Sequence, residues 1–349
     1  MLRELGISDF LTARSERTVI DVRAPKEFAS GHIPGAVNIP LFTDEERAVV
    51  GTTYKRVGRD AAIRKGLQIT GPKLEQFLDA SQQAAPNRKL AMHCWRGGMR
   101  SKSMATLFDF AGFDVAILKG GYKAYRRQAR ALFEQPLPLI ILGGKTGSGK
   151  TEMLKALSLA GEQIIDLEQL AHHKGSAFGD LGELPQPGTE MFENALFEQC
   201  HQLDVTKRIW VEDESHMIGT VFIPEPFWTS MRSAPVVYCD VPVEERIRFL
   251  VDTYGHYDAA GLVQAVHKIT KRLGGQHAKA ALTHFENGQL DEATRIVLVY
   301  YDKTYAYGLS QRNPELLYTL AIPKIQPAEN AQALIAFANT LQVHHEQIK

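Results

Sequence analysis

Residues 139–151 read LIILGGKTGSGKT, and this stretch decides the fold of the second half of the chain. Residues 139–142 are a continuous apolar run, which is typical of a buried strand, and a glycine-rich turn and a helical pattern follow it. The turn, residues 144–151, has the spacing of a P-loop, whose backbone N–H groups surround a di- or triphosphate. The strand before and the helix after are the context that this motif requires, so we predict an α/β domain that binds a phosphorylated ligand.

Each P-loop position has an expected role. The phosphate-binding residues are Gly144, Gly147, Ser148, Gly149, Lys150 and Thr151, with Lys150 bridging the outer phosphates as a catalytic cation. Thr151 is expected to ligate Mg²⁺ that arrives with the diphosphate substrate. Carboxylates on the magnesium or acceptor side should end neighbouring strands, and the candidates are Asp166, Glu212 and Asp213. The alternative is that these three are solvated strand ends.

The rest of this half alternates strands and helices. Apolar strand patterns at 163–167, 208–211 and 235–239 predict a doubly wound, mostly parallel sheet. Residues 243 to about 305 are mainly helical in pattern, which predicts a helical extension that carries Lys268, Lys271, Arg272 and Lys279. Pro136 and Pro138 mark the boundary, so we predict domains at 1–135 and 136–349.

The first half is also an α/β pattern, with strands at 18–22, 91–93 and 115–118 and helices at 72–81, 101–110 and 122–133. Its charge differs from that of the second half. Residues 1–135 hold 22 basic and 14 acidic residues, whereas the remainder holds 18 basic and 26 acidic ones. A polyanionic partner should therefore meet the first domain, unless the opposite charges only attract the two halves to each other.

Residues 93–101, HCWRGGMRS, form a loop between a strand and a helix and contain the candidate nucleophile, Cys94. Backbone N–H groups, the helix dipole and the nearby Arg96 and Arg100 all favour thiolate over thiol, so we class all three residues as catalytic. The alternative is a buried, inert cysteine, as we expect for Cys200 and Cys239. With 3 widely spaced cysteines, we expect neither a disulfide framework nor a structural metal site.

A cysteine followed by five residues and an arginine serves two chemistries, phosphate-ester hydrolysis and chalcogen transfer. The upstream run VIDVRAPKEFASGHIPGAVNIP, residues 19–40, resembles the amino-terminal signature of rhodanese domains, and LKGGYKAYR, residues 118–126, resembles their carboxy-terminal signature. The resemblance implies that Cys94 transiently carries sulfur or selenium. The loop is one residue longer than that of common sulfurtransferases and is similar to that of the phosphatase relatives. We hypothesise that it leaves room for selenium.

A rhodanese-like α/β domain followed by a P-loop NTPase-like domain with a helical C-terminal extension resembles the tRNA 2-selenouridine synthase family over nearly the full length. Further family-like segments are residues 173–179, 214–215, 218–219 and 272–276. The resemblance implies that selenium from selenophosphate replaces the sulfur of 2-thiouridine at the tRNA wobble position. It also implies an S-geranyl-2-thiouridine intermediate made from geranyl diphosphate, and a selenophosphate-producing enzyme as a possible partner. We expect no organic cofactor.

Contact with tRNA requires a basic surface. The candidate residues, beside Tyr54, are Arg47, Lys55, Arg56, Arg59, Arg64 and Lys65. The alternative is a solvated charged face. A glycine-rich loop with His172 and His173 is expected to contact substrate rather than metal, because adjacent side chains on an extended segment point to opposite sides.

Three other functions fit parts of the pattern. They are an ATP-dependent kinase or ligase fused to a rhodanese sulfurtransferase, a phosphatase that uses Cys94 and Arg100, and a non-catalytic RNA-binding scaffold. The sequence contains no signal-peptide pattern and no apolar run of membrane-spanning length, from which we expect a cytoplasmic protein without membrane contact.

Overall fold

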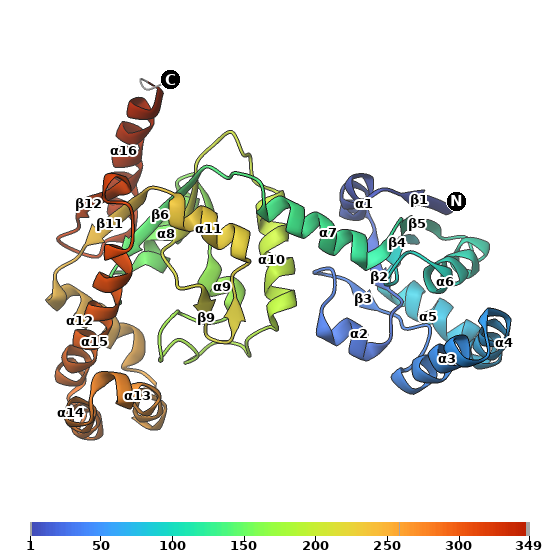
Figure 1. The fold of residues 1–349 in the computed structure, drawn as a ribbon, viewed down its shortest axis with the longest axis horizontal. Coiled ribbons are helices and arrows are strands. Elements are labelled where there is room, and N and C mark those ends of the chain that lie inside the picture. Colours follow the sequence, from blue (N-terminus) through green and yellow to red (C-terminus); the bar gives the residue numbers. More distant parts are fainter. Residues whose placement is uncertain (1, 258, 347–349) are drawn as a thin grey trace. The chain divides into compact units, whose positions relative to one another are not determined.

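The computed structural model describes residues 2–257 and 259–346. The chain divides into two compact units, which Figure 1 traces along the chain. The first comprises Met1–Leu132 together with Glu193–Glu198, and the second comprises Phe133–Phe192 and Gln199–Lys349. The division between Leu132 and Phe133 falls close to the boundary expected after Gln135, whereas the sequence did not predict that Glu193–Glu198 belong with the first unit.

The first unit is built on a five-stranded sheet in which every described strand pair is parallel. Its strands, in spatial order, are β1 (Leu2–Leu5), β5 (Asp114–Leu118), β4 (Lys89–His93), β2 (Thr18–Asp21) and β3 (Val37–Asn38). Its helices are α1 (Ile7–Ala13), α2 (Pro25–Ser30), α3 (Asp44–Arg56), α4 (Arg59–Thr70), α5 (Leu74–Ala84), α6 (Met99–Phe110) and α7 (Gly121–Phe133). The central strands are buried on both faces, which explains their continuous apolar runs.

Two residues of the amino-terminal signature form a buried ion pair in the first unit. Arg23 and Asp21 are both fully buried and form an ion pair with a 2.6 Å separation between Nη2 and Oδ2. The guanidinium also donates to the carbonyl of Gly31 at 2.6 Å and lies 4.1 Å from the ring centroid of Tyr122. Because a buried charge needs a full set of partners, the Asp-x-Arg of the signature has a structural role here.

The basic stretch of the first unit is a helical hairpin made by α3 and α4. Thr43 caps α3, since its hydroxyl accepts from the N–H of Glu46 while the Glu46 side chain accepts from the N–H of Thr43. The two helices pack against each other across a turn at Gly58, whose φ of 128° suits glycine. The sequence analysis singled out this stretch for its basic residues but did not predict its helical structure.

The second unit has a five-stranded parallel sheet. Its spatial order is β12 (Leu317–Ala321), β11 (Val236–Asp240), β6 (Leu139–Gly144), β8 (Ile209–Glu212) and β7 (Gln163–Ile165). Helices α8 (Lys150–Leu159) and α16 (Pro327–Glu346) share a core with Ile140 and Leu142 of β6. The remaining helices around this sheet are α9 (Leu167–Ala171), α10 (Thr189–His201) and α11 (Glu225–Ser233), and β9 (Met217–Ile218) pairs with β10 (Val221–Phe222).

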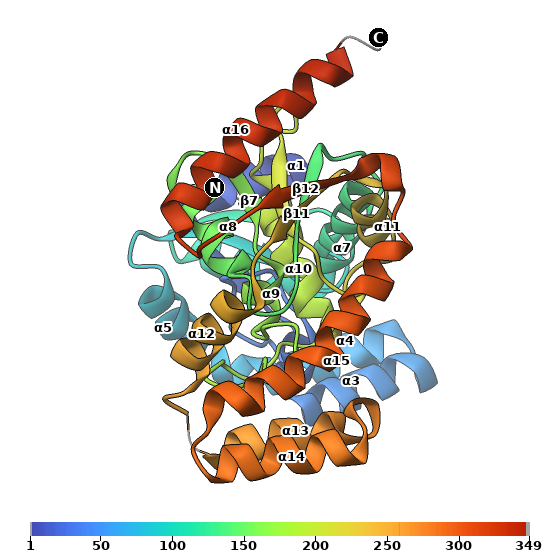
Figure 2. The same cartoon turned by 90° about the vertical axis from the view of Figure 1, so that its left-hand side faces the viewer.

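A helical extension follows β11, as predicted. It consists of α12 (Val243–Tyr254), α13 (Ala259–Leu273), α14 (Gly275–Glu286) and α15 (Leu290–Ser310). Figure 2 shows α13, α14 and α15 packed side by side. They enclose a core of their own, centred on Phe178, Val266 and Phe285. Among the described residues, no helix is long and apolar enough to span a bilayer.

Candidate active sites

The loop between β4 and α6 surrounds the sulfur of Cys94 with hydrogen-bond donors. The backbone N–H of Gly98 and the hydroxyl of Ser101 each lie 3.3 Å from Sγ. Burial of the sulfur disfavours ionisation, but the bonds from Ser101, the N–H of Arg96 and the charge of Arg100 outweigh it. Together they hold the pKa of the Cys94 thiol below its ordinary value. A larger thiolate fraction at neutral pH makes this sulfur a nucleophile.

The other two cysteines lie in a different environment. Cys200 and Cys239 are buried, and burial raises the pKa of each thiol to about 12. A thiol with so high a pKa remains protonated at neutral pH and is a poor nucleophile. The donors around Cys94 therefore distinguish it from the two thiols that the sequence analysis expected to be inert.

The carboxy-terminal signature is hydrogen-bonded to the backbone of the Cys94 loop. The N–H of Tyr122 donates to the carbonyl of Cys94 at 2.8 Å, and the N–H of Lys123 donates to that of Trp95 at 2.9 Å. Gly121 has a φ of 60°, and a Cβ there would collide with the carbonyl oxygen of Cys94. The glycine is required because the two backbones meet with no room for a side chain.

The two arginines of the loop differ in their contacts. Arg100 pairs with Glu27 of the amino-terminal signature, with 2.6 Å between Nη1 and Oε2. Arg47, a predicted tRNA contact, also reaches Glu27, with 3.7 Å between Nε and Oε2. Arg96 is exposed. Glu27 thus fixes Arg100 beside the loop, while Arg96 faces solvent.

We expect the Ser101→Ala variant to react more slowly with iodoacetamide at neutral pH. Loss of the hydroxyl donor removes a bond that favours the thiolate, so the pKa of Cys94 should rise and the pH–rate profile should move to higher pH. The measurement is the alkylation rate of Cys94, followed by mass spectrometry from pH 5 to about 10. Ser103→Ala is the matched control, because the Ser103 hydroxyl donates to the Arg100 carbonyl instead. An unchanged profile in Ser101→Ala would contradict this role for the hydroxyl.

The P-loop connects β6 to α8 as predicted. The ammonium of Lys150 donates to the carbonyl of Gly144 at 2.8 Å, within the loop itself. The hydroxyl oxygen of Ser148 is buried and has no hydrogen-bond partner among the described residues. Gly147 and Gly149 have φ values of 79° and 73°, a backbone conformation that glycine adopts without strain.

Two carboxylates that the sequence analysis missed lie closest to the end of the P-loop. The Thr151 hydroxyl donates to Oε2 of Glu168 at 2.8 Å, and the N–H of Glu168 donates to Oε1 of Glu212 at 2.8 Å. Glu214 shares a hydrogen bond with Glu168. Asp166 caps α9 by accepting from the N–H of Gln169 at 2.8 Å. Glu212 and Asp166 were predicted site residues, whereas Glu168 was not singled out and Glu214 was noted only within the family-like segment 214–215.

Asp213 supports the P-loop from outside this group. It forms an ion pair with Arg312 and accepts from the Tyr305 hydroxyl at 3.0 Å. That hydroxyl in turn accepts from the N–H of Gly144 at 2.8 Å. Glu212 and Asp213 are consecutive on extended backbone, so their side chains point to opposite sides. Glu212 therefore joins the group near Thr151, and Asp213 links the loop to α15.

The carboxylates around Thr151 hold protons more tightly than ordinary ones. Burial raises the pKa of Asp166 and of Glu168, and it raises the pKa of Glu212 and Glu214 well above the usual value, partly because the neighbouring carboxylates repel one another's charge. Oxygen donors of this kind suit Mg²⁺, which needs only one or two protein ligands when phosphates supply others. Within the described residues, no set of three or more His, Cys, Asp or Glu side chains is arranged to hold a metal.

A large cleft of about 1070 Å³ opens over the P-loop. All six predicted phosphate-binding residues line it, as do Asp166, Glu168 and Asp213. Its basic side chains suit a polyanion, and they are Lys150, Lys155, Lys174, Arg232, Lys268 and Arg272. His173 also lines it, whereas Lys271 and Lys279 of the helical extension do not. The predicted substrate loop and part of the predicted arm thus meet at one cleft.

The predicted tRNA-contacting residues lie on α3 and α4. Lys55, Arg56, Arg59, Arg64 and Lys65 are exposed, and Arg47 is half-buried beside Glu27. Tyr54 and Val57 on the same hairpin expose 59% and 73% of their surface. The hairpin thus combines exposed positive charge with apolar surface, a combination typical of RNA-binding faces.

Both halves of the chain match models of known protein families. A model of the tRNA 2-selenouridine synthase AAA domain matches residues 137–332, and a model of the rhodanese-like domain matches residues 8–128. A tRNA 2-selenouridine synthase of Shewanella piezotolerans is 37% identical over 87% of this chain and 92% of its own. One from Nitrosomonas europaea is 31% identical over 88% of this chain and 94% of its own.

Among solved structures, the N-terminal domain of a putative ATP/GTP binding protein from Clostridium difficile is 38% identical over 36% of this chain and 96% of that chain, with a TM-score of 0.34.

Proposed function

The chain belongs to the tRNA 2-selenouridine synthase family, and from this premise we propose how its two sites divide the reaction. It is a transferase that acts on tRNA and uses a selenium donor. The P-loop cleft alkylates the substrate sulfur with geranyl diphosphate, and the Cys94 loop activates selenophosphate. The observation that supports this division is that each unit contains its own loop between a parallel strand and a helix, with hydrogen-bond donors around Lys150 in one and around Cys94 in the other.

The first step takes place at the P-loop. The loop N–H groups and Lys150 bind the diphosphate and stabilise the negative charge that grows on it as its bond to the allylic carbon breaks. The diphosphate leaves with the electron pair, the C2 sulfur of the wobble 2-thiouridine bonds to that carbon, and the N3 proton is lost. Thr151 and Glu168 would hold Mg²⁺, which supplies further charge neutralisation for a diphosphate leaving group.

The second step uses the Cys94 loop. Its N–H groups and Arg100 suit the phosphate of selenophosphate. The Cys94 thiolate bonds to the phosphorus, the P–Se bond breaks and selenide leaves with the electron pair, and water then hydrolyses the S–P bond to restore the thiolate and release phosphate. Selenium then bonds to C2, and the bond from C2 to sulfur breaks, so geranylthiolate leaves with the electron pair. Trp95 and Met99 expose 38% and 51% of their surface beside Cys94, which offers a stacking surface to an unstacked base.

Selenophosphate must reach this loop from a selenophosphate-producing enzyme, which we propose as a partner. We also propose a cytoplasmic location, where glutathione and thioredoxin keep thiols such as that of Cys94 reduced.

The experiment that tests the proposal is mass spectrometry of nucleosides from 2-thiouridine tRNA. The tRNA is incubated with the full chain and Mg²⁺, with geranyl diphosphate alone and then with selenophosphate added. We expect S-geranyl-2-thiouridine first and 2-selenouridine second. If wild-type protein forms no geranylated nucleoside but hydrolyses ATP in a manner that requires Lys150, the kinase or ligase function is correct instead.

We further propose that α3 and α4 contact the tRNA, and we expect Arg64→Glu combined with Lys65→Glu to weaken tRNA binding by about tenfold or more at physiological salt. The two exposed cations would no longer release counterions from phosphates, so the dependence of affinity on salt concentration should also become shallower. Filter binding at several salt concentrations measures both. Lys89→Glu is the control, since the Lys89 side chain is 45% exposed in the same unit but lies outside the hairpin. Equal effects of both changes would exclude a specific role for the hairpin.

A further inference from the structure

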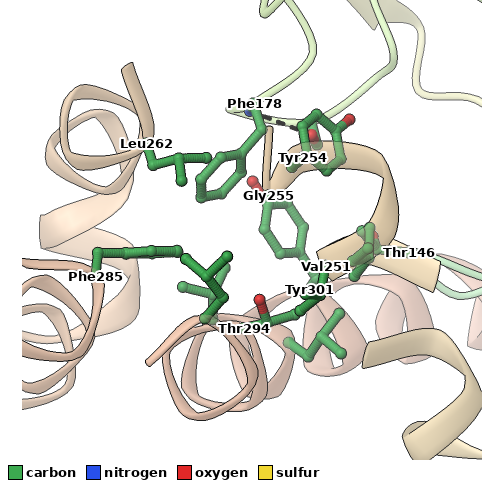
Figure 3. A pocket seen from close by; sticks show the side chains of 14 residues that line it. Thr146, Phe178, Val251, Tyr254, Gly255, Leu262, Phe285, Thr294 and Tyr301 are labelled. Atoms are coloured by element: carbon green, nitrogen blue, oxygen red, sulfur yellow. Dashed lines mark hydrogen bonds between the residues drawn. The ribbon is translucent and has the colours of Figure 1, made fainter. Parts of the chain in front are cut away.

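A second, apolar pocket lies in the helical extension and begins at the P-loop. Fourteen described residues line it, and Figure 3 shows Phe178, Leu262 and Phe285 pointing into the same space as Tyr301 and Thr294. On the measure that gives about 1070 Å³ for the cleft over the P-loop, the pocket has a volume of about 50 Å³, so it is narrow. The pocket is therefore a cavity between helices α12 to α15, and none of those fourteen residues has a charged side chain.

The pocket and the phosphate cleft adjoin each other. Five residues line both spaces, and they are Thr146, Ser176, Leu250, Tyr254 and Tyr301. Thr146 belongs to the P-loop itself. Leu250 packs against Gly147 of that loop, since a Cβ added at Gly147 would lie 2.7 Å from Leu250 Cδ1. A ligand that extends from phosphates on the P-loop past Thr146 and Leu250 would therefore reach the apolar pocket.

The hydroxyl groups at the mouth already have partners within the protein. The Tyr301 hydroxyl accepts from the N–H of Ala177 at 2.9 Å, and Ser176 forms side-chain hydrogen bonds with Tyr254 and Tyr301. With these groups occupied, the wall presents mainly carbon surface. A nucleotide base requires polar partners for its ring nitrogens and amino groups, whereas a hydrocarbon chain requires none.

We propose that this pocket binds the isoprenoid tail of the allylic diphosphate whose diphosphate lies on the P-loop. The inference rests on the proposed function and assigns the tail to a site. Tyr254 and Tyr301 put aromatic rings at the junction of the two spaces, where the allylic carbon next to the diphosphate lies. Aromatic rings stabilise the positive charge that develops on this carbon as the diphosphate leaves.

The test compares the binding of geranyl diphosphate and inorganic pyrophosphate to the full chain in the presence of Mg²⁺, by calorimetry. Pyrophosphate occupies only the P-loop, so the ratio of the two affinities reports the tail. Each methylene removed from water contributes about fourfold in affinity. We therefore expect geranyl diphosphate to bind wild-type protein at least about a hundredfold more tightly than pyrophosphate.

Val251→Phe, on the pocket wall, fills the pocket and should raise the Kd of geranyl diphosphate by about tenfold or more while leaving that of pyrophosphate unchanged. Unchanged pyrophosphate binding also shows that the variant is folded. Val243→Phe is the matched control, because Val243 lies on the same helix, exposes 40% of its surface and does not line the pocket. It should alter neither affinity.

The remaining outcomes are distinct. If geranyl diphosphate binds no more tightly than pyrophosphate, or if Val251→Phe weakens both ligands equally, the pocket does not hold the tail, while the diphosphate site of the proposed function stands. If neither diphosphate binds wild-type protein and ATP does, the proposed function itself fails.

Discussion

Selenation by the Cys94→Ser variant is expected to fall by at least about 10³-fold, because a serine hydroxyl is not ionised where the cysteine thiolate is. Gly98, Ser101 and Arg100 stabilise negative charge at this atom, and a neutral hydroxyl makes little use of them. Geranylation should proceed at the wild-type rate, since the P-loop cleft contains no part of the Cys94 loop. S-geranyl-2-thiouridine should therefore accumulate in the tRNA.

The measurement is a time course of both nucleosides by mass spectrometry. Cys200→Ala is the matched control, because the Cys200 thiol is buried and burial raises its pKa to about 12, so selenation should be unchanged. Selenation that persists in Cys94→Ser would remove Cys94 from the reaction and favour a non-catalytic role for this loop. Loss of both activities, with tRNA binding intact, would contradict the division into two sites.

Geranylation by the Lys150→Ala variant is expected to fall by about 10² to 10³-fold, the typical effect of removing one preorganised group that stabilises a leaving oxyanion. Lys150 donates to the carbonyl of Gly144, across the loop in which the phosphates bind. Selenation of tRNA that already carries the S-geranyl group should be retained, because that step does not release diphosphate.

The effects of Lys150→Ala on geranylation and on selenation can be measured separately with two tRNA substrates. Tests with 2-thiouridine tRNA report both steps, whereas tests with tRNA geranylated beforehand report the second alone. Lys145→Ala is the matched control, because Lys145 belongs to the same loop but does not line the cleft and lies 3.9 Å from Asp302. A Lys150→Ala variant that geranylates at the wild-type rate would show that the P-loop serves another ligand.

The sequence by itself determined the two α/β units, the P-loop and the Cys94 loop as strand–turn–helix segments, and the helical extension. Each depends on neighbours in the chain. A P-loop is a strand, a turn and a helix in succession, and the Cys94 loop has the same local order, so glycine spacing and apolar periodicity suffice to identify both. For the same reason, the sequence distinguished Cys94 from Cys200 and Cys239, which lie within apolar patterns.

Only the tertiary structure decided which distant side chains complete the sites. Glu27 accepts a hydrogen bond from Arg100, which lies 73 positions away in the chain. The Tyr305 hydroxyl accepts one from the N–H of Gly144, which lies 161 positions away. Glu168 and Glu214 join Thr151 because parallel strands end at one edge of the sheet, although no general chemical motif marks either residue as a site residue. The apolar pocket likewise forms only when separate helices pack together, since each helix alone shows an ordinary apolar face. Sequence periodicity reports that a face is buried, but the shape left between buried faces depends on how the side chains of several helices fit together.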